Sequence, residues 1–234
     1  MTEIIKHEVN QFKGFFSEQL DSFLKSIQAP YPNTKVIRPS QIYECQRWIV
    51  GDILGLIPFE PKSAVQQRVL DNGSYVHKRI LQKYLPRMGI VSHILDIKKG
   101  EVKQFIEVSL RDDSLWMKGS PDAIILNPND GLAYVFELKS MRDGEFRILE
   151  DAKIEHIMQL HMYFYLTNLK QGILFYENKD NQQTKEFVLQ KSDVLMNKIL
   201  NKISLIQKAV AEKNLNIPCE NTAQKSCKCV GLMV

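Results

Sequence analysis

The sequence of 234 residues lacks a long apolar run: the apolar stretch at 49–57 is interrupted by Asp52 and is too short to span a bilayer. The N-terminus also lacks the apolar segment of a signal peptide, because Glu3, His7 and Glu8 fall where that segment would lie. We therefore expect an intracellular, cytoplasmic protein with no membrane partner.

Cysteine is scarce, and neither sign of charge dominates. Four cysteines are too few for a disulfide scaffold, and in a reducing compartment they indicate a metal site or buried thiols. The 31 basic and 27 acidic side chains leave a net charge of +4, which permits a nucleic-acid partner without arguing for one. The sequence also lacks the Gly-x-x-x-x-Gly-Lys-Ser/Thr motif, which excludes a P-loop motor.

An apolar content of 44% excludes overall disorder, and the chain length favours one large domain with extensions. Helical spacing predicts helices at 3–28, from Ser40 as N-cap through Ile49, and at 63–84 with a stop at Pro86. Strands are expected at 90–97, 101–110, 115–118, 122–126 and 133–139. A helix at 151–168, strands at 172–177 and 184–189, and a last helix capped by Ser192 follow. The expected class is α/β, with helices around a mixed sheet.

The hairpin formed by the strands at 122–126 and 133–139 carries the candidate chemistry. Side chains alternate along a strand, so Glu137 and Lys139 share one face while Leu138 points into the core. Pairing of the strands brings Asp122 close to Glu137, and two close carboxylates favour a cation between them. Oxygen ligands suit Mg²⁺ or Mn²⁺. The alternative is that these charges lie on a solvated face of ordinary strands.

Two further elements complete an ordered set of motifs. His77 lies on the predicted third helix, and Gln159 and Tyr163 are four residues apart on one face of the helix at 151–168. The order is a helical His, a Gly-x-x-Asp strand start at 119–122, an acidic-x-Lys strand at 137–139, and a Gln-x-x-x-Tyr helix. This order, over roughly residues 38–229, resembles the RecB-like exonuclease branch of the PD-(D/E)XK nuclease superfamily.

The resemblance implies a restriction-endonuclease-like core and a metal-dependent DNA nuclease. It assigns Mg²⁺ or Mn²⁺ to His77, Asp122, Glu137 and the backbone carbonyl of Leu138. It makes Lys139 the residue that activates or positions the attacking water. Gln159 and Tyr163 would contact the substrate or support that lysine. It also implies one nuclease domain over 1–234, with a helical region at 1–86, a catalytic core at 87–190, and a C-terminal helix and cysteine tail at 191–234.

The four cysteines, Cys45, Cys219, Cys227 and Cys229, add a second resemblance, to the iron–sulfur members of the same branch. In those proteins a 4Fe-4S cluster ties the C-terminal tail to the N-terminal helical region, and a structural cluster is implied here. The spacing Cys219-x₇-Cys227-x-Cys229 departs from the Cys-x-x-Cys pair usual in the family. Zinc on four thiolates and free thiols therefore stay as alternatives.

Basic side chains near these motifs are candidates for contacts with DNA phosphates. They are Lys78, Arg79 and Lys83 on the third helix, and Arg142 and Arg147 after Lys139. Solvated helix faces would explain them equally well. We expect His156 and His161 to lie at the surface.

We therefore expect an exonuclease that hydrolyses single-stranded DNA or DNA ends in recombination, repair, or viral or mobile-element DNA processing. The nearest alternative is a CRISPR-adaptation nuclease that trims DNA before integration. Recombination or CRISPR-adaptation proteins would be the partners. A non-catalytic DNA-binding scaffold and a sequence-specific endonuclease of the same superfamily are further alternatives.

Overall fold

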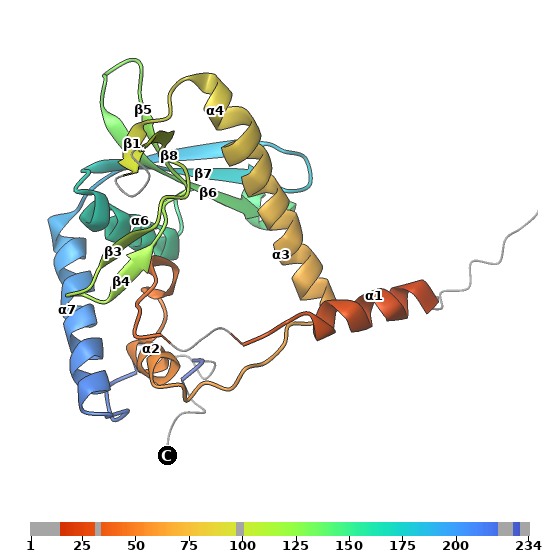
Figure 1. Ribbon diagram of the computed structural model, residues 1–234, viewed down its shortest axis with the longest axis vertical. Coiled ribbons are helices and arrows are strands. Elements are labelled where there is room, and N and C mark those ends of the chain that lie inside the picture. Colours follow the sequence, from red (N-terminus) through yellow and green to blue (C-terminus); the bar gives the residue numbers. More distant parts are fainter. Residues whose placement is uncertain (1–14, 31–33, 97–100, 220–226, 230–234) are drawn as a thin grey trace, which may run out of the picture. The chain divides into compact units, whose positions relative to one another are not determined.

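The computed structural model describes residues 15–30, 34–96, 101–219 and 227–229 (Figure 1). It contains two compact units, Met1–Tyr31 with Phe59–Asp71, and Pro32–Pro58 with Asn72–Val234. All predicted site residues belong to the second unit. None of the described helices combines the length and the apolar character that a membrane span requires.

The first unit contains α1 (Phe15–Ser26) and the start of α3 (Ala64–His77). Arg68 forms an ion pair with Asp21 at 2.7 Å. The Gln28 side chain donates to the backbone carbonyl of Lys62 at 3.0 Å and accepts from its N–H at 2.7 Å. The helix predicted at 3–28 is confirmed over the range of α1, and its first twelve residues lie outside the described ones.

The second unit is built on a four-stranded mixed sheet in the order β5-β6-β7-β8 (Figure 1). The strands are β5 (Ala123–Leu126), β6 (Ala133–Met141), β7 (Gln171–Asn178) and β8 (Thr184–Gln190). β6 and β7 are parallel, and the other pairs are antiparallel. The parallel pair is joined through α6 (Ile154–Thr167), as a parallel pair needs a crossover. The predicted mixed sheet is confirmed.

Alternation along β6 divides the core into two layers. Phe136 and Leu138 pack with Val76 and Leu81 of the helix that follows Asn72. On the other face, Val135 packs against an apolar stripe of α6, which includes Leu160, Tyr163 and Phe164. Glu137 and Lys139 share the parity of Val135, so the strand period directs them toward α6.

The helix at Ala64 runs past the predicted stop at Pro86. α3 continues into the π-helix η2 (Lys78–Tyr84) and then α4 (Leu85–Met88), which ends at Gly89 with φ 70°. Pro86 lies in the first turn of α4, where proline is tolerated because its missing N–H breaks no hydrogen bond within α4. The π-helix η2, which is wound more widely than an α-helix, comes directly before it. The prediction was wrong because it read Pro86 as a breaker.

Ser40 is not the N-cap of the second helix. It lies inside the 3₁₀ turn η1 (Pro39–Gln41), and α2 (Gln46–Ile53) starts only after Cys45. Pro39 favours a tight first turn, and the Gln41 side chain accepts the backbone N–H of Arg38 at 3.3 Å. The Gln41 side chain thus caps η1, and α2 itself begins without a side-chain cap.

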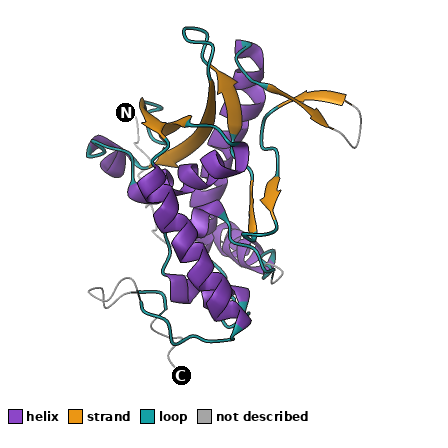
Figure 2. Ribbon diagram, turned by 90° about the vertical axis from the view of Figure 1, so that its left-hand side faces the viewer, coloured by secondary structure: helices purple, strands orange, loops and turns teal. Residues whose placement is uncertain are grey.

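Two short hairpins lie apart from the main sheet (Figure 2). They pair β1 (His93–Asp96) with β2 (Glu101–Gln104), and β3 (Leu110–Asp112) with β4 (Met117–Gly119). The strand expected at 101–110 is interrupted, because Glu107 has φ 49° and donates its N–H to the carbonyl of Asp122 at 3.0 Å. Residue 97, the end of the strand expected at 90–97, lies outside the described part of the chain.

α5 (Asp143–Arg147), which the sequence analysis missed, follows β6, and α7 (Asp193–Ala211) closes the second unit. The predicted Ser192 cap is confirmed, since its hydroxyl accepts the N–H of Leu195 at 3.3 Å. Ile199, Ile203 and Ile206 of α7 pack with the apolar residues of α2. This contact places the start of α2, and with it Cys45, beside the segment that follows α7.

Candidate active site and cysteine cluster

Asp122 and Glu137 meet across the β5–β6 hairpin, as the sequence predicts. Ala123 pairs with Phe136, so Asp122 and Glu137 are the next positions along the two strands. Both carboxylates are buried, with residue exposures of 8% and 4%. The alternative that these charges belong to a solvated face is therefore wrong.

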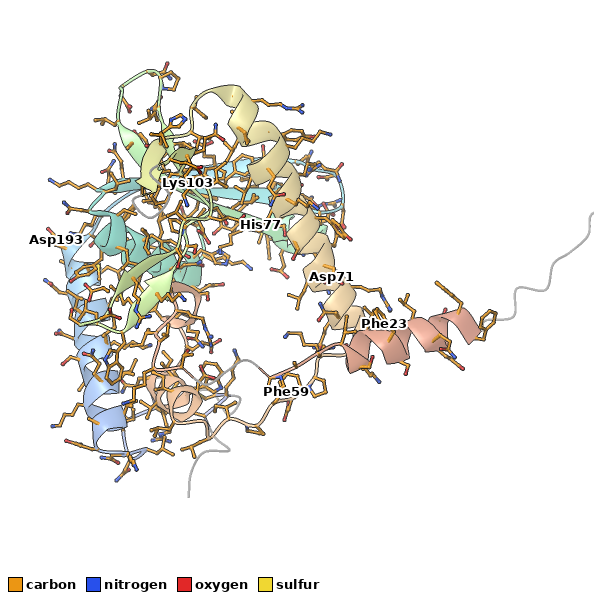
Figure 3. All side chains as sticks on the ribbon, viewed as in Figure 1. Phe23, Phe59, Asp71, His77, Lys103 and Asp193 are labelled. Atoms are coloured by element: carbon orange, nitrogen blue, oxygen red, sulfur yellow. The ribbon has the colours of Figure 1, made fainter. Side chains whose placement is uncertain are left out.

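One group of atoms forms around Asp122 and residue 138. The backbone N–H of Leu138 donates to Asp122 Oδ2 at 2.6 Å. His77 Nε2 lies 3.0 Å from the Leu138 carbonyl oxygen and 3.5 Å from Asp122 Oδ2, and its Nδ1 donates to the Gly73 carbonyl at 3.0 Å. Figure 3 labels His77 on the helix beside the sheet. Three of the predicted metal ligands therefore converge here.

A second group of atoms forms around Glu137, one residue away. Glu137 Oε1 accepts from Lys139 Nζ at 2.8 Å and from Gln159 Nε2 at 2.7 Å. Lys139 Nζ also donates to Gln159 Oε1 at 2.8 Å, which closes a triangle between β6 and α6. Glu137 Oε2 is buried without a hydrogen-bond partner among the described residues. An unpaired buried carboxylate oxygen is costly, so this atom fits a cation ligand.

Tyr163 and Gly119 brace this network. The Tyr163 hydroxyl donates to the Ser120 carbonyl at 3.0 Å and accepts from Gln159 Nε2 at 3.4 Å. A Cβ on Gly119 would lie 2.6 Å from the Pro39 ring and 3.1 Å from Tyr163. The glycine of the Gly-x-x-Asp motif therefore allows η1 and α6 to approach the strand that leads to Asp122.

Burial and neighbouring charges shift the pKa values of two site residues. Burial raises the pKa of Glu137 to about 7, against the attraction of Lys139. Burial alone would lower the pKa of His77, but the hydrogen bond and charge of Asp122 raise it to about 9. The raised pKa values of Glu137 and His77 show that the surroundings of Asp122 and Glu137 favour an added positive charge.

The arrangement fits a hard divalent cation. Two carboxylates, one imidazole nitrogen and one backbone carbonyl form the ligand set that the resemblance implies, and the unpaired Glu137 Oε2 is left available. Mg²⁺ and Mn²⁺ accept such oxygen-rich sets with open positions.

The predicted DNA-binding side chains differ in their surroundings. Lys78 and Arg142 are exposed, and Arg142 precedes α5. Arg147 is exposed and forms an ion pair with Asp143 at 2.7 Å, and Arg79 pairs with the buried Glu177. The last pair is a structural contact of the sheet.

The two histidines of α6 are not simple surface residues. His161 is buried, with Nδ1 donating to the Ile157 carbonyl at 2.8 Å and Nε2 accepting the Ser192 N–H at 3.0 Å. His156 is partly buried, and its Nδ1 lies 2.8 Å from the Tyr176 hydroxyl. The expectation was wrong because both rings have hydrogen-bond partners from distant segments.

The four cysteines form one cluster. Their sulfur atoms all lie within 4.8 Å of one another, and five of the separations are 3.1–3.7 Å. Three of the side chains are buried, and Cys219 is partly buried. Four thiols at such distances match the thiolate ligands of one metal centre.

Polar side chains around α2 hold the segment at 217–218, which precedes Cys219. These contacts were not predicted from the sequence. Gln46 donates to the Pro218 carbonyl at 3.0 Å, and Arg47 donates twice to the Ile217 carbonyl, at 2.6 and 3.0 Å. Lys202 of α7 donates to the Glu44 carbonyl at 2.7 Å. Gln46 and Arg47, two polar residues directly after Cys45, were the only indication of these contacts in the sequence.

A comparison with known protein families finds no match. Over 124 residues, 49% of this chain, the sequence is 32% identical to the CRISPR-associated exonuclease Cas4 of Saccharolobus solfataricus. The matched region spans 59% of that relative's length.

Solved structures are similar over more of the chain. An alkaline exonuclease from Laribacter hongkongensis has a TM-score of 0.52 at 12% identity, covering 84% of this chain and 93% of its own. A phage-related exonuclease from Haemophilus somnus has a TM-score of 0.50 at 13% identity, covering 76% of this chain and 94% of its own. The chain therefore has the fold of these exonucleases, in agreement with the resemblance that the order of its motifs carries.

Proposed function

We propose that the protein is a metal-dependent DNA exonuclease that acts on single strands or DNA ends. The observation that carries the proposal is the hydrogen-bonded triangle of Glu137, Lys139 and Gln159 beside Asp122, with one buried carboxylate oxygen left unpaired. A degenerate scaffold has no need to hold a lysine beside two buried acids. The likeness to proteins named exonucleases supports the same reading.

His77, Asp122, Glu137 and the Leu138 carbonyl would hold Mg²⁺ or Mn²⁺, which lowers the pKa of a bound water and offsets charge on a phosphate. Lys139 is positioned by Glu137 and Gln159 to donate a hydrogen bond to the attacking water or to the developing oxyanion. Gln159 keeps this ammonium in place, and Tyr163 keeps Gln159 in place. Phosphodiester hydrolysis is the chemistry that these roles serve.

One candidate for the biological setting is recombination, repair, or processing of viral or mobile-element DNA. The alternative setting, trimming of DNA in CRISPR adaptation, is favoured by the similarity to a CRISPR-associated exonuclease. A pull-down from the native organism, probed for recombination or integration proteins, separates the two settings.

The cysteine cluster would hold a structural metal centre. The resemblance favours a 4Fe-4S cluster. The short sulfur separations suit one tetrahedral ion, since four Zn–S bonds of about 2.3 Å give sulfur–sulfur edges of roughly 3.8 Å. A cubane binds its thiolates on four separate irons and would need the sulfurs farther apart. The absorption spectrum and the iron and zinc content of anaerobically purified protein decide between the two.

The nuclease test uses end-labelled single- and double-stranded DNA with Mg²⁺, with Mn²⁺ and with a chelator. We expect metal-dependent degradation by the wild type and none by Lys139→Ala, with the exposed Lys198→Ala as the matched control that retains activity. Absence of cleavage by folded protein with its cysteine metal in place would make the DNA-binding scaffold the leading alternative.

A further inference from the structure

A cleft of about 680 Å³ lies beside the candidate active site. Its lining includes four basic side chains, Lys35, Arg38, Arg111 and Lys118, and it reaches Ser120 and Tyr163. No acidic side chain is among the described residues that line it. None of the four basic residues was among the DNA-binding candidates from the sequence.

The backbone fixes where these charges lie. The segment before η1 runs parallel to β4 through the Ile37–Met117 bridge, with the Ile37 N–H donating to the Trp116 carbonyl at 2.7 Å. β4 in turn pairs with β3, where Arg111 lies directly opposite Lys118. The segment before η1, β4 and β3 therefore lie side by side and together form one positively charged side of the cleft.

The positive charge of this cleft is only partly balanced. Like charges directly opposite on paired strands destabilise a sheet, and Arg111 and Lys118 form such a pair. Arg111 contacts Asp113, and Arg38 lies 3.2 Å from Asp52. Lys118 is exposed and forms no ion pair within the described part of the chain. A polyanion bound in the cleft would relieve this repulsion.

The cleft is continuous with the catalytic network. Tyr163 lines it, and the hydroxyl of the same residue contacts Gln159, the partner of Lys139. Ser120 lines it two residues before Asp122. A ligand in the cleft would therefore lie next to the groups proposed to cut DNA.

We propose that this cleft binds the sugar–phosphate backbone of single-stranded DNA adjacent to the scissile bond. The proposal rests on the proposed nuclease function and names the subsite that holds its substrate. The cleft volume falls in the range of small-molecule sites, about 300–1,000 Å³. A cleft of this size can hold a short stretch of one strand.

Fluorescence anisotropy with a labelled single-stranded oligonucleotide tests the proposal, in buffer without added divalent metal ion so that no cleavage occurs and the cysteine metal stays in place. The variants are Lys118→Gln, the double variant Arg111→Gln/Lys118→Gln, and the control Lys198→Gln on α7. We expect several-fold weaker binding for the first and a larger loss for the second. The slope of log affinity against log salt should shrink by about 0.7 for each lost phosphate contact. Lys118→Arg should restore most of the binding.

Unchanged affinity and salt slope in the double variant would overturn the proposal, and so would an equal loss for blunt duplex DNA. If the double variant unfolds, as judged by circular dichroism, Lys118→Gln alone decides, because that side chain is exposed. Binding through the cleft by a wild type that never cleaves would refute only the nuclease function.

Discussion

Leu138 takes part in the candidate site through its backbone alone. Its N–H holds Asp122 and its carbonyl oxygen faces His77, while its side chain is fully buried in the core. The middle residue of the acidic-x-Lys motif therefore ties the ligand geometry to the packing of the sheet. Strand alternation predicted that the Leu138 side chain points into the core and that Glu137 and Lys139 share the other face, whereas the role of the Leu138 carbonyl is implied by the resemblance alone.

Gln159→Ala should lower kcat/KM for DNA cleavage by about 10- to 100-fold, the range seen when a residue that orients metal-site groups is removed. The change leaves Glu137 Oε1 and Lys139 Nζ with one partner fewer each. Tyr163→Phe keeps the ring and removes only the hydroxyl, so its loss should be smaller. Equal activity of Gln159→Ala and wild type would contradict the positioning role.

Gly119→Ala should lower the free energy of unfolding by about 1–3 kcal/mol, because the added Cβ overlaps the Pro39 ring. Denaturant unfolding measures the change. Gly144→Ala is the matched control, since a Cβ there meets nothing within 4 Å. Equal stability of the two variants would contradict the prediction, because it would mean that Pro39 of η1 moves away from the added Cβ at no cost.

At the scale of elements, α6 contributes Gln159 and Tyr163 to the candidate site, and His161 of the same helix bonds the start of α7. His161 bonds the Ile157 carbonyl with one nitrogen and the Ser192 N–H with the other, so its neutral form is required. The elements themselves were predictable from apolar spacing. The helix through Pro86, the 3₁₀ turn at Ser40 and the partners of His161 were not, because each depends on contacts that local spacing does not encode.

Acid should destabilise the protein through α6. Burial lowers the pKa of His161, and burial with the charges of Lys139 and Lys153 lowers that of His156 to about 3. Both therefore take up a proton less readily in the fold than in the unfolded chain, where histidine protonates near pH 6.5. The contribution of the two histidines to the free energy of unfolding is therefore complete above about pH 6.5. It decreases as the pH is lowered further, by at most about 1.4 kcal/mol per pH unit for each histidine.

Urea unfolding at pH 7.5 and pH 5.5 measures this effect as the difference between wild type and His161→Asn. The difference removes the contribution of His77, whose raised pKa acts in the opposite sense. The variant should lose less stability than the wild type on acidification. The exposed His93→Gln should behave like the wild type, and the same response in all three proteins would contradict the prediction.

At the scale of the molecule, the cysteine cluster joins parts of the chain that are far apart in sequence. Cys45 and Cys229 are separated by 184 positions. The pattern of one early and three late cysteines implied this closure through the second resemblance, and the order of predicted elements indicated the mixed sheet. Neither could predict the basic cleft, because Lys35 and Arg111 come together only through the Ile37–Met117 bridge and the pairing of β4 with β3.

Cys45→Ser should abolish metal binding at the cluster and lower the free energy of unfolding. Opening a loop of this length costs roughly 5 kcal/mol in the chain-entropy description of a cross-link. Metal analysis and denaturant unfolding measure the two effects, and limited proteolysis should cut first near residues 212–218. Chelator should destabilise the wild type and leave Cys45→Ser unchanged. A variant as stable as the wild type would contradict the structural role.

The long separation of the cysteines also sets an order of events during synthesis. At about 5–20 residues per second, a ribosome needs roughly 10 to 40 s to pass from Cys45 to Cys229. Residues 77–163, which hold every candidate catalytic side chain, emerge within that interval. The nascent chain therefore presents the sheet and its acids before the four cysteines can meet, so a metal ion bound by all four would be loaded only after the candidate catalytic residues have been synthesised.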